Sequence, residues 1–124
     1  MIIQLDDLEV YKTAMELGED TWQMVDGWSI FAKDTIGKQI VRSADSIALN
    51  IAEGCGRFHF KENKNFCYIA RGSNMETKCA MQKAINRKLI TEAAFSEFNV
   101  KQQRFHKLLN GYIKSIGVNK PSGQ

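Results

Sequence analysis

The residues best suited to chemistry cluster around the segment Gly54-Cys55-Gly56-Arg57. A glycine-rich turn holds phosphate when it follows a strand, ends in Gly-Lys-Ser or Gly-Lys-Thr, and opens a helix. Here the glycines follow a predicted helix, and neither tripeptide comes after them. We therefore predict that this segment ends a helix, with Gly54 in the left-handed conformation that glycine adopts without strain.

Cys55, His59 and Cys67 are the residues that could bind a metal ion, with the spacing Cys-x3-His-x7-Cys. That spacing matches no common zinc site, and no fourth ligand is evident. Glu53 and Glu76 could be paired carboxylates, but the di-iron pattern of helical bundles needs Glu-x-x-His on two helices. The sequence contains no Glu-x-x-His. We predict no metal, no cofactor and no catalytic residue, so an enzyme is not expected.

The three cysteines are Cys55, Cys67 and Cys79, which cannot all pair within one chain. Free thiols are typical of a cytoplasmic protein, and Cys67 and Cys79 are expected to pack as small apolar residues. No apolar run approaches the roughly 20 residues that span a bilayer. The first residues also lack the basic segment and apolar block of a secretory signal. We predict a cytoplasmic location and no membrane partner.

Four amphipathic helices would position these residues, because apolar side chains recur at spacings of three and four. The helices are predicted at residues 6–26, 34–53, 61–87 and 91–116. Asp6 and Glu9 suggest a capping box, and Thr91 is the expected N-cap of the fourth helix. The side chains sharing one face of each helix are, in order, Leu8, Tyr11, Met15, Gly18, Trp22 and Val25; Ile36, Ile40, Ala44, Ile47 and Ile51; Phe66, Ile69, Ser73, Glu76, Ala80 and Ala84; and Phe95, Phe98, Gln102, Phe105, Leu109, Tyr112 and Ile116.

Long helices joined by short connections predict an all-α, up-down-up-down four-helix bundle. The length of 124 residues fits one domain. We assign residues 1–117 to this domain and residues 118–124 to a flexible tail. Gly18 would weaken the first helix, so we expect another helix to approach it closely. Trp22 is expected in the core.

A polar stripe accompanies the apolar stripe of the second predicted helix. It contains Gln39, Ser43, Ser46, Asn50 and Glu53 at spacings of four and three. The stripe is either a solvated face or a partly buried network between helices or between copies. Small serine and glycine residues favour the network, because exposed helix faces favour Lys, Glu and Gln.

Within such a network, Asn50 and Glu53 are predicted to bond with Arg71 or Arg57. The predicted polar seam consists of Gln39, Arg42, Ser46, Asn50, Glu53, Arg57, Arg71, Ser73 and Glu76.

Charge is unevenly distributed along the chain, whose net charge is +3. Residues 1–34 hold eight acids and two bases, whereas residues 35–124 hold six acids and fifteen bases. One interpretation pairs an acidic first helix with a basic helix of the same chain or a neighbouring copy. The other is a basic surface for nucleic acid. The predicted contacts with RNA or DNA are Lys83, Arg87, Lys88, Lys101, Arg104 and Lys107.

Several motifs also resemble a known family. QIVRSADSIALNIAEGCGRF, at residues 39–58, resembles the second-helix motif of the 23S rRNA intervening-sequence proteins, and FCYIARGS resembles their third-helix motif. DLEVYKTAMEL and LNGYIKSIG are similar to the opening and closing segments of that family. The resemblance covers about residues 5–117. It implies a left-handed bundle that assembles into a ring, typically a pentamer. His59 stands where the family often has a serine able to cap the third helix.

Taken together, these features predict a non-enzymatic, oligomeric scaffold that binds RNA or DNA through basic residues of its third and fourth helices. The alternative is a protein–protein interaction module without a nucleic-acid role. The expected partners are further copies of the chain, in a predicted pentamer, and either RNA or DNA or another protein.

Overall fold

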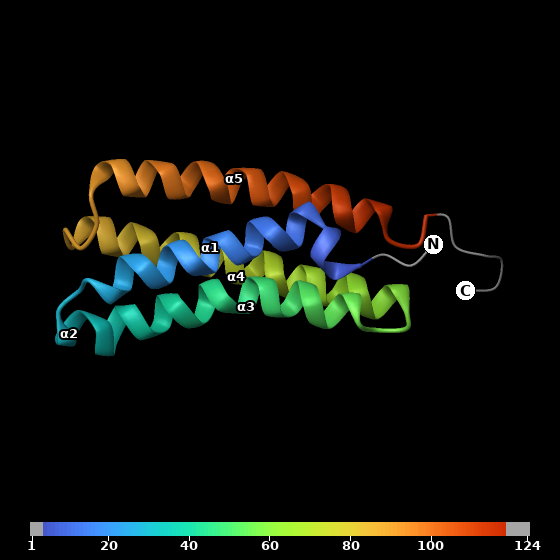
Figure 1. Ribbon diagram of the computed structural model, residues 1–124, viewed down its shortest axis with the longest axis horizontal. Helices are drawn as coiled ribbons and strands as arrows, with labels where there is room; N and C mark the ends of the chain where they lie inside the picture. The colour runs from blue at the N-terminus through green and yellow to red at the C-terminus, as the bar shows by residue number, and fades with distance from the viewer. Residues whose placement is uncertain (1–3, 119–124) are drawn as a thin grey trace.

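The computed structural model describes residues 4–118, in which four long helices form a bundle (Figure 1). They are α1 (Glu9–Asp26), α3 (Lys38–Cys55), α4 (Phe60–Asn86) and α5 (Glu92–Ser115). Successive long helices run in opposite directions along the bundle (Figure 1). The predicted all-α bundle is therefore confirmed, while its handedness stays a prediction. Of the predicted tail at residues 118–124, residues 119–124 lie outside the described residues.

Each long helix packs against two others around a common core. α1 contacts α3 and α5, and α4 contacts the same two helices. α3 and α5 therefore lie diagonally opposite one another (Figure 1). Leu17, Ile47 and Phe105 are fully buried between the helices. Each such side chain stabilises the fold by about 1.5–3 kcal/mol relative to its exposed state.

The predicted apolar faces of α3 and α5 are confirmed. All five predicted residues from Ile36 to Ile51 are buried. On α5, five of the predicted residues are buried and Phe95 and Tyr112 are partly buried. The stripe holds every isoleucine of α3 and every phenylalanine and tyrosine of α5, so hydropathy identifies the inner face of each helix.

The predicted faces of α1 and α4 are rotated relative to the structure, and this prediction was wrong in part. On α1, Trp22 is 58% exposed rather than in the core, and Met15 is also exposed. The buried residues of α1 are Val10, Thr13, Ala14, Leu17, Gly18, Thr21 and Val25. Those of α4 are Cys67, Ala70, Asn74, Thr77, Ala80, Met81 and Ala84.

Small side chains explain this rotation. A Cβ atom on Gly18 would lie 2.9 Å from Asp45 Oδ1 on α3, so the expected close approach at Gly18 exists. Helices that pack through Ala, Thr and Gly come close together, and larger neighbouring side chains are then left at the rim. Ile69 and Glu76 of α4 are exposed for this reason. Cys67 is buried as predicted, whereas Cys79 is exposed and that prediction was wrong.

The start of α1 also differs from the prediction. Asp6 belongs to a 3-10 turn, Leu5–Asp7, and Leu8 precedes α1 without a side-chain cap, so the predicted capping box does not form. At the start of α5, Thr91 Oγ1 accepts a hydrogen bond from the Ala94 amide at 3.1 Å, which confirms the predicted N-cap.

The second predicted helix begins earlier than expected. Ser29 caps the short helix α2 (Ile30–Ala32), which continues through a π-helical turn, Lys33–Gly37, into α3. His59 precedes α4 without a side-chain hydrogen bond to the helix.

Gly54 does not adopt the predicted left-handed conformation, because α3 continues through it to Cys55. Its role is close packing instead. A Cβ atom at this position would lie 2.6 Å from Asn63 Oδ1 and 2.9 Å from Phe66 Cβ on α4. The absence of a side chain at residue 54 therefore lets the end of α3 touch the first turns of α4.

Candidate functional site

Two pairs of hydroxyl groups join α3 to α4, one within the predicted polar seam and one beside it. Ser46 Oγ donates to Ser73 Oγ at 2.6 Å, and Ser43 Oγ lies 2.9 Å from Thr77 Oγ1. Ser43 and Thr77 are buried. The hydroxyls of Ser43, Ser46 and Thr77 also lie within hydrogen-bonding distance of a backbone carbonyl of their own helix, whereas Ser73 Oγ is bonded through Ser46. This part of the seam fixes how α3 sits against α4.

At the C-terminal end of α3, the predicted polar seam becomes a cluster of ion pairs on the surface. Arg57 Nη2 lies 2.7 Å from Glu53 Oε1, and Arg57 Nη1 lies 3.5 Å from Glu62 Oε2. The Arg57 guanidinium also stacks 4.9 Å from the centre of the Phe66 ring. These side chains are each more than two-fifths exposed, so the ion pairs contribute little to stability.

The remaining seam residues are not brought into this network. Asn50 Nδ2 bonds back to the Ser46 carbonyl at 2.7 Å within α3, so the predicted contact of Asn50 with an arginine does not form. Arg71 Nη1 instead donates to Asn110 Oδ1 on α5 at 3.1 Å. Gln39, Arg42 and Glu76 are exposed. The seam is therefore a structural contact at its centre and a solvated surface at its ends.

A buried amide pair between α4 and α5 was not predicted as a unit. Gln102 Nε2 donates to Asn74 Oδ1 at 2.8 Å and to the Asn74 carbonyl at 3.0 Å. Only 4% of Gln102 and 8% of Asn74 is exposed. The sequence indicated that Gln102 is buried, because it lies on the predicted inner face of the fourth helix. The sequence did not identify Asn74, because the predicted inner face of α4 contained Ser73 instead of its neighbour Asn74.

Acidic α1 and basic α5 pair within the chain, as one of the two interpretations of the charge distribution predicted. Lys101 Nζ lies 2.6 Å from Asp20 Oδ2 and 3.7 Å from Glu16 Oε1. Arg104 donates to Thr13 Oγ1 at 3.0 Å and lies 3.5 Å from Glu9 Oε2. Two of the six predicted nucleic-acid contacts are thus occupied by acids or hydroxyls of the same chain.

The other four predicted contacts lie on or beside the groove between α4 and α5. Two adjoining cavities of about 290 and 410 Å³ make up this α4–α5 groove, and Met75 and Lys78 line both. Lys107 lines the first cavity and Lys83 the second. Arg87 and Lys88 are exposed where α4 ends.

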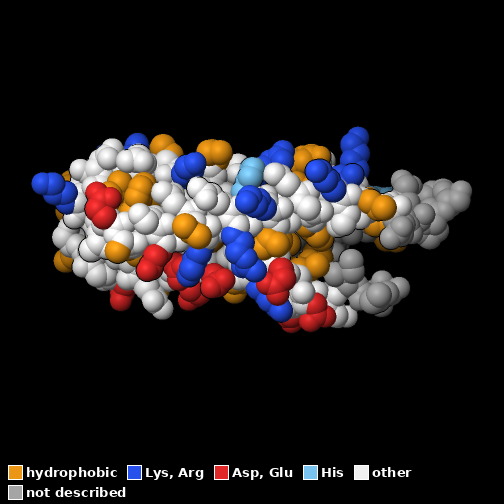
Figure 2. Space-filling view, turned by 90° about the horizontal axis from the view of Figure 1, so that it is seen from above, with side chains coloured by type: hydrophobic (Ala, Val, Ile, Leu, Met, Phe, Trp, Pro, Cys, Tyr) orange, Lys and Arg blue, Asp and Glu red, His pale blue; other side chains and the backbone are white. Residues whose placement is uncertain are grey.

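Among residues 4–118, none of the bases Lys78, Lys83, Arg87, Lys88 and Lys107 lies within ion-pair distance of an acid. Figure 2, which looks down on α5, shows mostly Lys and Arg side chains along the upper part of this face, whereas Asp and Glu side chains gather along the lower part with Lys and Arg among them. We call Arg71 and these five bases the basic surface.

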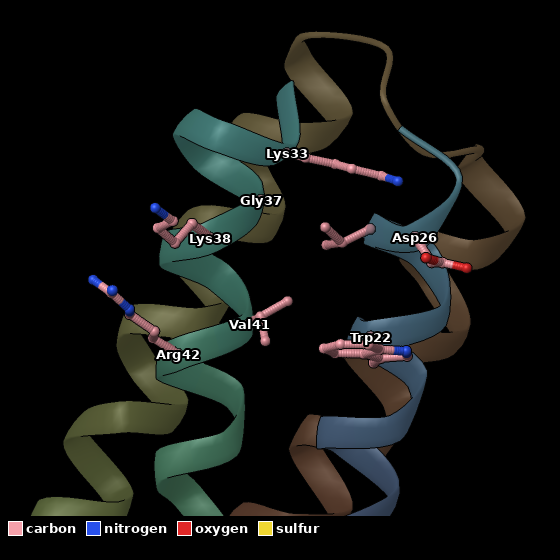
Figure 3. Close-up of a pocket in the computed structure, with 8 residues that line it drawn as sticks. Trp22, Asp26, Lys33, Gly37, Lys38, Val41 and Arg42 are labelled. Atoms are coloured by element: carbon pink, nitrogen blue, oxygen red, sulfur yellow. The ribbon is translucent and has the colours of Figure 1, made fainter. Parts of the chain in front are cut away.

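A second candidate surface is the face that α1 and α3 share on the acidic side of the bundle. A cavity of about 360 Å³ opens between them. Trp22 on α1 points across this gap toward Val41 on α3, and Lys33 reaches over the gap (Figure 3). Lys38 and Arg42 line the rim, with their charged ends directed away from it (Figure 3).

Further along the same helices, a cavity of about 250 Å³ is lined mainly by apolar side chains, including Tyr11, Met15 and Leu49. Glu19 and Asp45 also line it. Burial against the neighbouring helix, together with the charge of Glu19, raises the pKa of Asp45 above its ordinary value. We call the surface formed by Tyr11, Met15, Trp22, Val41 and Leu49 the α1–α3 face.

The cysteine and tyrosine groups at the end of the bundle form a small polar cluster. Cys55 Sγ lies 3.6 Å from the Tyr112 hydroxyl, to which Asn63 Nδ2 donates at 3.3 Å. Burial raises the pKa of Tyr112 to about 12 and that of Cys67 to about 11. A thiol with so high a pKa is a poor nucleophile. In the part of the chain that the structure describes, no three His, Cys, Asp or Glu side chains gather into a possible metal site.

Comparisons with known proteins identify a matching family model and a solved structure with a similar fold. The family model described as 23S rRNA-intervening sequence protein matches residues 6–111. A crystal structure from Bacteroides thetaiotaomicron, described as a protein with unknown function from the S23 ribosomal protein family, has a TM-score of 0.76. The match covers 86% of this chain and 99% of that chain at 24% sequence identity, so it supports the fold.

No curated protein matches the chain. Among the described helices, none has the length and apolar character that crossing a membrane requires. Because the family model spans most of the sequence, the chain belongs to the 23S rRNA-intervening sequence protein family.

Proposed function

We propose that the protein is a non-enzymatic, cytoplasmic scaffold that binds nucleic acid along the α4–α5 groove. The observation that carries this proposal is that some of the predicted bases are paired with groups of the same chain, whereas others have no acidic partner among the described residues. Lys101 and Arg104 are paired with groups on α1, whereas the basic surface has no acid within ion-pair distance among the described residues. Bases without acidic partners are available to neutralise phosphates, which supplies most of the affinity for nucleic acid.

The length of the basic surface suits an extended strand. From Arg71 to Arg87, α4 rises by about 24 Å, at 1.5 Å per residue. Positively charged grooves of this kind track the backbone of single strands over several nucleotides. At one end, the Arg71 guanidinium stacks 5.2 Å from the centre of the exposed Tyr68 ring, so an aromatic face lies beside the charge.

Binding of labelled RNA and DNA strands across a salt series tests this function. For single strands, the logarithm of the binding constant should fall linearly with the logarithm of salt concentration, by about 0.7 for each phosphate neutralised. Four to six contacts would give a slope between about −3 and −4. Absence of binding at low salt would contradict the proposal and would favour a protein partner.

The α1–α3 face favours a second function, which is self-association. Trp22, Met15 and Leu49 are exposed large apolar side chains on one face. The occupant that we propose is a second copy of this chain. Glu19 and Asp45 line the cavity on this face without an ion-pair partner among the described residues, so bases of the second copy that lie outside the α4–α5 groove would complement them.

Contact between two different faces is heterologous, and such contacts form a ring when the rotation between successive copies closes. The family resemblance implies five copies. Trp22→Glu should lower the mass measured by light scattering, whereas Val100→Glu, a charge placed on the exposed surface of α5, should not. A protein that is monomeric at micromolar concentration before mutation would contradict self-association.

A further inference from the structure

The first cavity of the α4–α5 groove has a composition that the binding of phosphate alone does not require. Its basic side chains, Lys78 and Lys107, are joined by His106 and by amide groups. The floor is the buried pair of Asn74 and Gln102. Lysines alone suffice as point charges for phosphates, whereas amides present both donors and acceptors to the edge of a base.

One atom of this floor lacks a hydrogen bond. Gln102 Oε1 is buried and has no partner among the described residues, while Nε2 of the same amide bonds Asn74 twice. An unsatisfied buried acceptor costs about 1–3 kcal/mol, so it is an unusual feature to find inside a packed bundle. Because this atom exposes less than 1 Å² to solvent, a donor in the cavity reaches it only after a neighbouring side chain moves.

The side chain at the mouth of the cavity can move to admit such a donor. Met75 lines the cavity and is 60% exposed. Methionine is unbranched and has flexible torsions, so it repacks at low energetic cost. The volume of about 290 Å³ is close to the lower end of the range for small-molecule sites.

We propose that this cavity holds one unpaired nucleobase of a single-stranded nucleic acid, a site that deepens and rests on the proposed function. Lys78 and Lys107 hold the flanking phosphates. Gln103 contacts the edge of the base, and an amino or imino N–H of the base donates to Gln102 Oε1 after Met75 moves aside. The side chain of Met75 then packs on the face of the base. A base within a duplex cannot enter, because its edge is already paired.

The decisive probe is a labelled DNA strand of about eight nucleotides, within the site sizes known for single-strand grooves, compared with a strand of the same length that is abasic at every position. Both strands carry the same phosphates. The intact strand should bind at least about fivefold more tightly, since contact with a base is worth about 1–3 kcal/mol. Lys78→Glu should weaken both strands by the same factor. Gln103→Ala should weaken only the intact strand.

Gln102→Met provides a second variant, in which a side chain of similar length lacks the acceptor. Its melting temperature is measured first, and the Gln103→Ala comparison stands if Gln102→Met does not fold. Equal affinity for intact and abasic strands would overturn the nucleobase site and leave the proposed function intact. Tighter binding of a duplex than of the intact single strand would also overturn it. Failure of both strands to bind at low salt would overturn the site together with the proposed function.

Discussion

Lys101 on α5 donates a 2.6 Å hydrogen bond to Asp20 on α1, which joins the basic and acidic parts of the chain. The hydrogen bond to Asp20 raises the pKa of Lys101, and the charges of Asp20, Glu16 and Glu97 add to the increase against an opposing effect of burial. A raised lysine pKa means that folding favours the charged form. This stability is fully present below the ordinary pKa of 10.5 and is lost as pH rises through the folded-state pKa.

Lys101→Met should therefore lower the free energy of unfolding at pH 7. The loss should be at most about 1 kcal/mol, because both side chains are partly exposed and solvent screens the pair. Urea unfolding at pH 7 and above pH 10.5 measures the difference between variant and wild type. That difference should shrink at the higher pH, and a constant difference would show that packing of the lysine stem is responsible instead.

Gly54 and Gly72 are two helical glycines whose replacement by alanine should have opposite effects. Gly54→Ala should destabilise the fold by about 1–3 kcal/mol, because its Cβ would overlap Asn63 and Phe66. A Cβ on Gly72 meets no atom within 4 Å, so Gly72→Ala should stabilise α4 by up to about 1 kcal/mol. Urea midpoints measure both changes. Equal effects of the two substitutions would contradict close packing at Gly54.

The hydroxyl contact between Ser46 and Ser73 should show energetic coupling. Ser46→Ala should cost about 1 kcal/mol, because Ser73 Oγ then has no hydrogen-bond partner among the described residues. Ser73→Ala should cost less, because Ser46 Oγ keeps its bond to the Ser43 carbonyl. The double variant should cost less than the sum of the two single variants, since no unpaired hydroxyl is left. Unfolding free energies of all four proteins provide this comparison. Strict additivity would indicate that the two serines act independently.

The cluster of Cys67 and Tyr112 should make the fold less stable in alkaline solution. Burial raises the pKa of Cys67 from 9.0 to about 11 and that of Tyr112 from 10.0 to about 12. Above pH 9 the unfolded chain loses these protons first, so the free energy of unfolding decreases as pH rises. Tyr112→Phe should flatten this decrease above pH 10.

Thiol labelling provides an independent check of the same cluster. In the native protein at pH 8, exposed Cys79 should react quickly and Cys67 slowly. Mass spectrometry of the labelled peptides distinguishes the two sites. Comparable labelling rates at Cys79 and Cys67 would contradict the shielding of Cys67.

The sequence was most informative where one helical stripe held the large apolar side chains. Ile40, Ile47 and Phe105 left only one inner face for α3 and α5. It was least informative for α1 and α4, where Ala, Thr and Gly form the inner face and Trp22 lies beside it. Small residues carry little hydrophobic signal, and their importance depends on how closely the neighbouring helix approaches. Hydropathy alone therefore selected the wrong rotation.

The candidate site was predicted in outline but not in detail. Serines on the second helix indicated a seam that included both Ser46 and Ser73. The partner of Ser43 depended on the correct rotation of α4, so Thr77 was missed. Charge composition indicated a basic surface without showing that α1 neutralises Lys101 and Arg104. Such pairing depends on which helices become neighbours across about 80–95 residues of sequence.

The most direct test of nucleic-acid binding by the α4–α5 groove compares two double charge reversals. Lys78→Glu with Lys107→Glu alters the groove, whereas Lys38→Glu with Arg42→Glu makes the same change of net charge on α3, the helix diagonally opposite α5. Affinity for a labelled single strand is measured for both across a salt series. We predict that the groove variant binds at least tenfold more weakly, with a salt slope shallower by about two. We also predict that the α3 variant stays close to wild type. Equal losses for the two variants would show that only net charge matters and would contradict a binding groove between α4 and α5.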